Sequence, residues 1–155
     1  MSVFLKSFNI TKNWVDYNNH MNMAYYVLIF DEAWEVVLEK FKMGASAAKN
    51  LNRSTMVVET NTKYLNEVKE GESVDINLTY FDHDKKRLHL KMEMIAKETK
   101  KISASMEWIS LYIDLSKRKV TEFEEEKLKL MASFIEKNEA KFSSENLLFT
   151  SKLKK

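Results

Sequence analysis

The sequence predicts one α+β domain in which an antiparallel five-stranded sheet wraps around a long central helix at about residues 22–43. Three observations support this fold class. Apolar residues recur at helical spacing across the helix. The segments after it alternate apolar and polar side chains and are joined by short turns. A second helical pattern follows at about 121–141. We therefore expect a single domain over 1–155, with its core at about 3–116.

Composition narrows the class of protein. The chain has 155 residues, 45% of them hydrophobic, and no cysteine, which excludes disulfides and thiolate nucleophiles. Its 25 basic and 23 acidic residues give a net charge of +2, which provides no whole-protein argument for nucleic acid. No apolar run is long enough to cross a membrane, and Met1–Lys6 lacks the basic start and apolar core of a signal peptide. We expect a cytoplasmic protein with no membrane or nucleic-acid partner.

The N-terminal part is predicted to form a strand at 3–11, a loop at 12–21 and then the long helix. Asn22 is suited to cap the start of this helix, and Gly44 stands where a C′ glycine would end it. At 1.5 Å per residue the helix is about 30 Å long, the longest single element of the chain. One side of it is apolar and the other is largely acidic.

Beyond a linker at 45–53 the pattern changes to period two, with many β-branched residues. The predicted strands are 54–68, 74–80, 88–94 and 102–115, with turns at 70–72, 82–86 and 97–101. Thr121 is placed to cap the closing helix. Strands joined by short turns form an antiparallel meander. The long helix must bury its apolar stripe, which includes Tyr26 and Trp34, against one face of that sheet.

The stretch Asp16-Tyr17-Asn18-Asn19-His20-Met21-Asn22 leads directly into the long helix. It places a carboxylate, three amides and an imidazole beside a helix N-terminus, where backbone N–H groups are unpaired and carry partial positive charge. This combination suits hydrolysis of an activated carbonyl. One group attacks or activates water, and the donors hold the oxygen that becomes negative.

The order of elements and the pattern Asp16…His20-Met21-Asn22…Tyr25-Tyr26…Phe30-Asp31-Glu32-Ala33 resemble hotdog-fold acyl-CoA thioesterases of the 4-hydroxybenzoyl-CoA thioesterase type. A narrower resemblance is to the betainyl-CoA thioesterases, which also occur fused to carnitine dehydrogenase. Three motifs carry it, over about residues 10–130: Trp14-Val15-Asp16-Tyr17-Asn18-x-His20-Met21-Asn22, Tyr64-Leu65-x-Glu67-Val68-x-Glu70-Gly71 and Asp82-His83-Asp84-x-Lys86-Arg87-Leu88-His89.

The resemblance implies that Asp16 acts as general base on water, or as a nucleophile that forms a mixed anhydride. An ordinary turn or capping aspartate is the alternative. His20 could orient Asp16, donate to the thioester oxygen or satisfy the loop backbone. Asn18 and Asn22 could donate amide hydrogens to the substrate, and Asn22 could equally be a plain helix cap. Asn19 departs from the family pattern, which usually has glycine there; Asn is the next-best residue for a positive φ.

Further residues are candidates for binding the substrate. The backbone N–H groups near Met23 and Ala24 are the oxyanion candidates. Tyr25 belongs to an aromatic set near the expected pocket. Within this set, Trp14 and Tyr17 stand on the loop and are the better candidates for a cation–π cage, which would suit a betainyl group.

Three charged candidates lie outside the loop. Glu59 interrupts an apolar strand and faces either the pocket or solvent. Lys86 and Arg87 occupy a basic hairpin that either meets the phosphates of coenzyme A or is simply solvated. The neighbouring His83 and His89 fit no zinc-ligand spacing, so no metal site is predicted.

The sequence therefore favours an acyl-CoA thioesterase for a short acyl group such as betainyl, with coenzyme A as part of the substrate and no metal or redox cofactor. The alternatives are a thioesterase for an aryl or medium-chain acyl-CoA, and a non-catalytic acyl-CoA sensor. The resemblance implies a homodimer or homotetramer whose pocket is made by both chains. Open sheet edges give a physical reason for the chains to pair.

Overall fold

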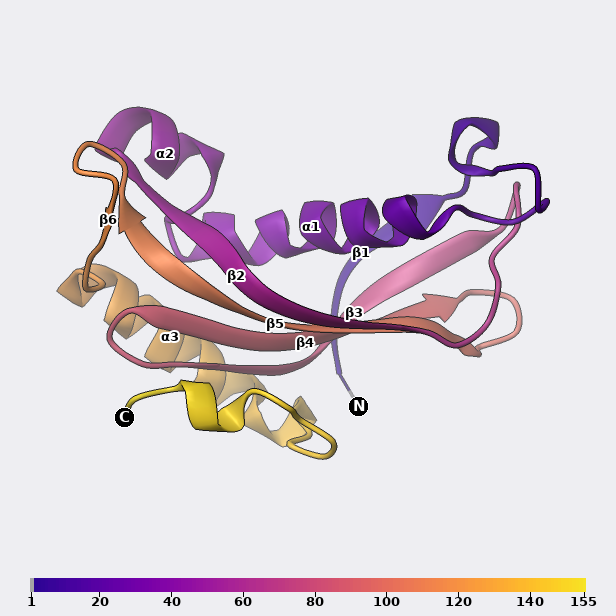
Figure 1. Cartoon of the computed structure of the whole chain (residues 1–155). Coiled ribbons are helices and arrows are strands. Elements are labelled where there is room, and N and C mark those ends of the chain that lie inside the picture. The colour runs from indigo at the N-terminus through magenta and orange to yellow at the C-terminus, as the bar shows by residue number, and fades with distance from the viewer. Residues whose placement is uncertain (1) are drawn as a thin grey trace.

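The helices and strands follow the predicted order, with two additions, α2 and β6 (Figure 1). A computed structural model describes residues 2–155. None of the helices in this described part combines the length and apolarity needed to cross a bilayer. The elements are β1 (Val3–Asn9), α1 (Met23–Lys40), α2 (Ala45–Leu51), β2 (Arg53–Tyr64), β3 (Ser73–His83), β4 (Arg87–Ala96), β5 (Ile102–Asp114), β6 (Lys119–Val120) and α3 (Glu125–Asn138).

All the strands join one antiparallel sheet. The order across it is β1-β3-β4-β5-β2, and the two-residue β6 pairs with the end of β5. The sheet curls around α1, which crosses its concave face (Figure 1). Five long strands around one central helix form the hotdog fold that the sequence predicted. The edges of the sheet are β1 and β2.

The core lies between α1 and the concave face of the sheet. The apolar stripe of α1 is buried along its whole length and comprises Tyr26, Ile29, Phe30, Ala33, Trp34, Val37 and Leu38. Alternate residues of β3, β4 and β5 point at it, among them Leu78, Met92 and Trp108, all at most 2% exposed. The predicted core positions of Tyr26 and Trp34 are confirmed. Because this packing holds α1 at both ends, it fixes where the helix N-terminus lies relative to the sheet.

The predicted end of the long helix is wrong by three residues. α1 ends at Lys40, because Lys42 adopts the left-handed conformation (φ 58°) that terminates a helix. Gly44 instead precedes α2, and a side chain there would collide with the carboxylates of Glu35 and Glu39. Glycine here allows the close approach of these two flexible side chains, which would have to shift to admit a Cβ, and its backbone is not left-handed (φ −82°).

The predicted linker at 45–53 is also wrong, because most of it forms helix α2. Its sequence is rich in alanine, which favours helix, but it is too short to show a clear period. Its first backbone N–H, at Ala45, donates to the Glu35 carboxylate over 2.8 Å. That bond anchors α2 to α1 beside β2.

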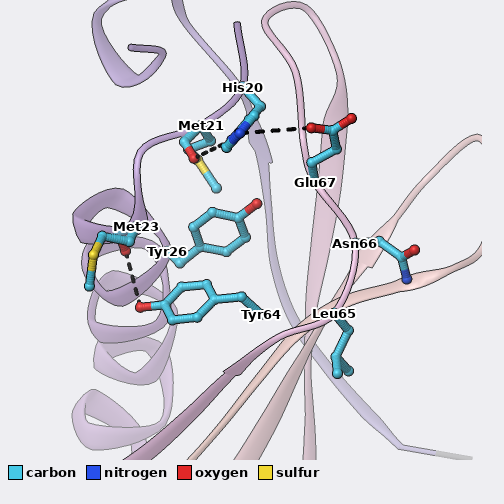
Figure 2. Close-up of a pocket in the computed structure, with 8 residues that line it drawn as sticks. All are labelled: His20, Met21, Met23, Tyr26, Tyr64, Leu65, Asn66 and Glu67. Atoms are coloured by element: carbon cyan, nitrogen blue, oxygen red, sulfur yellow. Dashed lines mark hydrogen bonds and ion pairs between the residues drawn. The ribbon is translucent and has the colours of Figure 1, made fainter. Parts of the chain in front are cut away.

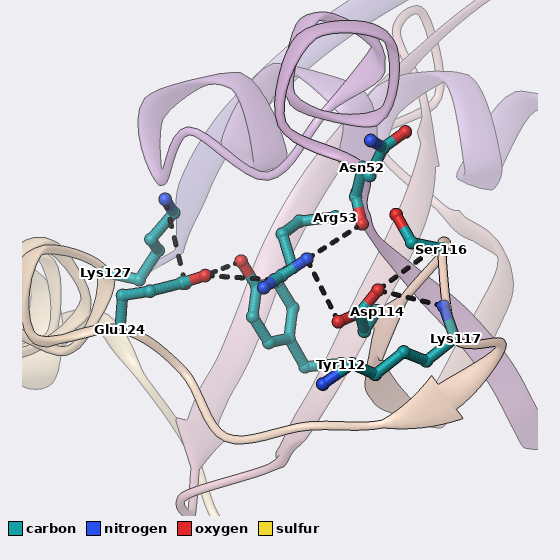
Figure 3. Close-up of polar contacts among 8 residues, drawn as sticks. All are labelled: Asn52, Arg53, Tyr112, Asp114, Ser116, Lys117, Glu124 and Lys127. Atoms are coloured by element: carbon teal, nitrogen blue, oxygen red, sulfur yellow. Dashed lines mark hydrogen bonds and ion pairs between the residues drawn. The ribbon is translucent and has the colours of Figure 1, made fainter.

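The closing helix starts at Glu125 rather than at Thr121, because the backbone N–H of Thr121 still donates to the carbonyl of Tyr112 on β5 (2.9 Å). A polar cluster then holds α3 to the sheet (Figure 3). The Tyr112 hydroxyl donates to Glu124 Oε2 over 2.7 Å, and Arg53 Nε donates to Glu124 Oε1 over 3.2 Å. Burial, together with this bond to the carboxylate, raises the pKa of Tyr112, so its hydroxyl stays a donor.

Residues 142–155 cross the convex face of the sheet (Figure 1). The buried carboxylate of Glu107 accepts the backbone N–H groups of Leu148 and Phe149, each at 2.9 Å. It also pairs with the buried His89 ring, 2.8 Å away. The C-terminal segment therefore covers this face of the sheet.

We predict that Tyr112→Phe lowers the free energy of unfolding by about 1 to 2 kcal/mol, because it removes a hydrogen bond to a charged, half-buried acceptor. Urea denaturation followed by circular dichroism measures this. Ser116→Ala is the matched control, since Ser116 contributes only its backbone N–H to the cluster through Asp114 (2.9 Å). Equal stability of Tyr112→Phe and the wild type would show that the cluster does not hold α3.

Candidate active site

The loop before α1 is closed by hydrogen bonds within itself. Val15 and Met21 form a bridge across it, and the Asp16 N–H donates to the His20 carbonyl over 3.3 Å. Asn19 has φ 64°, so the position where the family usually has glycine adopts the left-handed conformation, as expected for asparagine. The loop therefore keeps its turn despite this departure.

Both oxygens of the Asp16 carboxylate accept hydrogen bonds from the same loop. Oδ2 accepts from the Asn22 side-chain amide at 3.0 Å, and Oδ1 accepts from the Asn18 backbone N–H at 2.8 Å. These two donors, with Asn22 the stronger, lower the pKa of Asp16 below its ordinary value. The carboxylate is thus ionised at neutral pH, which is the form that a general base or nucleophile requires.

The side chain of Asn22 makes two hydrogen bonds. Its Oδ1 accepts the backbone N–H of Ala24 at 3.0 Å and so caps α1, while its Nδ2 binds Asp16. The Ala24 N–H is therefore occupied. The neighbouring Met23 N–H has no acceptor among the hydrogen bonds of residues 2–155, and of the two predicted oxyanion donors it is the one available.

The His20 ring faces a groove beside the start of α1 (Figure 2). Its Nδ1 lies 3.3 Å from the Met21 carbonyl and its Nε2 lies 3.8 Å from Glu67 Oε2. The groove has a volume of about 250 Å³ and is lined by His20, Met21, Met23, Tyr26, Tyr64, Leu65, Asn66 and Glu67.

The far wall of this groove comes from the end of β2 and the segment after it. The Tyr64 hydroxyl donates to the Met23 carbonyl at 3.4 Å, and its ring meets Tyr26 edge-on with centroids 5.1 Å apart. The Met21 N–H donates to the carbonyl of Val68 over 2.6 Å. Sequence reasoning did not assign Tyr64 to Glu67 to the site. The only signal was their presence in the second family motif, because the contact with the loop spans more than forty residues.

The aromatic candidates on the loop do not face one another. Trp14 stacks on Tyr25, with ring centroids 5.9 Å apart and planes 21° from parallel. Tyr17 is 92% exposed and has no aromatic contact within residues 2–155. A single chain therefore does not bring Trp14 and Tyr17 together as a cage.

The charged candidates outside the loop lie away from Asp16. Glu59 is exposed on β2, and its carboxylate lies 3.6 Å from the Nζ atom of Lys152, a residue of the C-terminal segment. Lys86 and Arg87 stand at the tip of the β3–β4 hairpin, at the opposite end of the sheet from the loop. Arg87 binds the Asp84 carboxylate at 3.0 Å, so part of its charge is already paired. Within one chain these groups do not share the Asp16 site.

The comparisons with known proteins identify the class and the family. The family match and the named relatives support a thioester hydrolase. Residues 10–134 match the model of the thioesterase-like superfamily, and the chain belongs to that family.

Two curated relatives are similar in sequence. One is the betainyl-CoA thioesterase of Pseudomonas aeruginosa, 28% identical over 131 residues, which are 84% of this chain and 82% of that protein. The other is the L-carnitine dehydrogenase/betainyl-CoA thioesterase of Agrobacterium fabrum, 27% identical over 106 residues, 68% of this chain and 22% of that longer protein.

Solved structures confirm the fold. A Staphylococcus aureus protein in complex with CoA superposes with a TM-score of 0.82 at 22% identity, covering 100% of this chain and 96% of that one. The 1,4-dihydroxy-2-naphthoyl-CoA thioesterase from Synechocystis superposes with a TM-score of 0.73 at 14% identity, covering 83% and 95%. At these identities the likeness establishes the hotdog fold alone.

We predict that Asn22→Ser shifts the acid limb of the pH profile of kcat/KM to higher pH. Serine can still cap α1, but it is too short to donate to Asp16, so the pKa of Asp16 rises toward its ordinary value and activity is lost earlier as pH falls. Asn18→Ala is the control, because Asn18 holds Asp16 mainly through its backbone N–H. An acid limb that Asn22→Ser leaves in place would contradict the assigned role.

Proposed function

We propose that this protein hydrolyses an acyl-CoA thioester to the free acid and coenzyme A, with Asp16 as general base or nucleophile. The observation that carries the proposal is the arrangement around Asn22. One side chain holds the ionised Asp16 and caps the helix, and it leaves the Met23 N–H free beside a groove. The name of the Pseudomonas relative supports coenzyme A as the carrier of the acyl group.

The chemistry follows from these positions. The thioester oxygen accepts the Met23 N–H, assisted by the partial positive charge of the α1 N-terminus, and this stabilises the negative charge that develops on that oxygen. Asp16 then either takes a proton from the attacking water or attacks the carbonyl carbon itself and forms an anhydride that water cleaves. In both routes the carbon–sulfur bond breaks and the coenzyme A thiolate leaves and is protonated.

The size of the groove is consistent with a short acyl group such as betainyl. Its volume of about 250 Å³ lies below the range of roughly 300 to 1,000 Å³ that is usual for pockets holding drug-sized ligands. Two curated relatives carry betainyl-CoA in their names. We therefore propose betainyl-CoA as the substrate to test first.

We also propose that the active unit is a dimer formed through β2. This edge strand has twelve residues and exposes a run of three apolar side chains, Met56, Val57 and Val58, whereas the opposite edge, β1, has only seven residues. A long apolar edge strand is a template for pairing with another strand. Met23, Val27 and Leu28 add exposed apolar surface on α1.

Such a dimer would change the surroundings of the site. Two copies related by a twofold axis pair their β2 edges in antiparallel fashion. The end of β2 at Tyr64 then lies beside the start of the partner's β2 at Arg53. The same pairing brings the partner's hairpin, with Lys86, toward the Asp16 end of this chain. The phosphates of coenzyme A would meet a basic group that one chain alone keeps at the opposite end.

We predict that Asp16→Asn lowers kcat by about 10² to 10⁴-fold, because the amide neither accepts a proton nor attacks the carbonyl. Thiol release from a panel of acyl-CoAs measures this. Glu136→Gln, an exposed acid of α3, is the control and should keep full activity. Undiminished hydrolysis by Asp16→Asn would refute the mechanism. Tight acyl-CoA binding without hydrolysis by the wild type would favour a sensor.

We predict that Val58→Lys converts the protein from a dimer to a monomer of 18.3 kDa, because it places a charge on the apolar pairing edge. Sedimentation equilibrium measures the mass. Phe4→Lys is the matched control: Phe4 is 58% exposed, close to the 56% of Val58, but lies on the opposite edge strand. A wild-type monomer, or a Val58→Lys dimer, would rule out pairing through β2.

A further inference from the structure

The groove beside the helix start has an unusual lining. Two tyrosine rings meet there at 88°; residue Tyr64 is 45% exposed, whereas Tyr26 is 4% exposed and backs it from the core. Glu67 contributes a carboxylate from the same wall as Tyr64, three residues further along the chain (Figure 2). Among residues 2–155 of one chain, no lysine or arginine lines the groove, and His20 is the single basic side chain that does. Its wall is thus aromatic and apolar with one negative charge.

This lining matches the chemistry of a quaternary ammonium group. Such a cation has no hydrogen to donate, so ordinary hydrogen-bond acceptors gain nothing by facing it. It is recognised instead by the negative faces of aromatic rings and by a nearby carboxylate. The Glu67 side chain lines the groove, is 58% exposed and lies 3.8 Å from the His20 ring, with which it forms an ion pair when that ring is protonated.

The position of Tyr64 also fits the length of a short acyl group. In a betainyl thioester a single methylene separates the cation from the carbonyl carbon, so the cation must bind next to the group that holds the carbonyl oxygen. The Tyr64 hydroxyl donates to the carbonyl of Met23, the residue whose own N–H is the free donor. The ring of Tyr64 is therefore attached to the same residue as the oxyanion donor.

We propose that Tyr64, Tyr26 and Glu67 form the subsite that recognises a quaternary ammonium acyl end, and that they determine the substrate preference of this enzyme. The proposal rests on the thioesterase function proposed above and names its substrate class. It assigns the role to the end of β2 rather than to the loop aromatics, because Tyr17 is exposed and has no aromatic neighbour in the described part of the chain, and Trp14 is stacked on Tyr25.

The test compares betainyl-CoA with its neutral carbon isostere, 3,3-dimethylbutyryl-CoA, which has the same shape without the charge. We expect wild-type kcat/KM to favour betainyl-CoA. Tyr64→Leu should reduce the ratio of the two kcat/KM values by about tenfold, since the aromatic face is lost. Glu67→Gln should reduce the ratio in the same direction, whereas Tyr64→Phe keeps the ring and should preserve it.

Lys63→Ala is the matched control, since Lys63 neighbours Tyr64 on β2 but does not line the groove. If Tyr64→Leu and Glu67→Gln each lowered kcat/KM equally for both substrates, the proposed subsite would be overturned. A wild type that cleaves the neutral thioester as well as the cationic one would also overturn it, although the thioesterase function would then stand. Calorimetric binding of both thioesters to Asp16→Asn separates the two proposals, because a preference for the cation must appear there without any hydrolysis.

Discussion

The two hydrogen bonds of the Asn22 side chain are the constraint on which the site depends. One of them caps the start of α1 by accepting the Ala24 N–H, and the other holds the Asp16 carboxylate. A helix cap usually serves stability alone. Here it also sets the direction and the ionisation of the acid, and it determines which N–H of the helix start remains free. The stability of the helix and the chemistry of the loop are therefore coupled through one amide.

This arrangement needs α1 to be held rigidly, and the sheet provides that support. The apolar stripe of α1 packs into the concave face, where β3, β4 and β5 present buried side chains at every second position. The loop is tied in turn to the segment after β2, through the Met21 N–H and the Val68 carbonyl. Helix start, loop and end of β2 thus form one unit, and the groove lies between them.

The pattern of side chains was sufficient to predict most of the fold. Long periodic segments predicted α1 and the strands of the sheet correctly, because burial on one face imposes a period on the sequence. The errors occurred where that signal is short or absent. α2 spans only two turns, and its position depends on Glu35 of α1. Thr121 has the right chemistry for a cap, but its backbone is still bonded to β5, so the helix begins later.

The sequence by itself determined the fold class, the candidate acid Asp16 and the capping residue Asn22, because these depend on local spacing within one loop and one helix. It also indicated that Asn19 could take the place of glycine. The tertiary structure alone decided that Ala24 is occupied while Met23 is free, and that Tyr64 and Glu67 face the loop. The capping of Ala24 depends on the side-chain conformation that Asn22 adopts, which residue spacing does not specify. The placement of Tyr64 and Glu67 depends on contacts between segments far apart in the chain, and such contacts leave no period in the sequence.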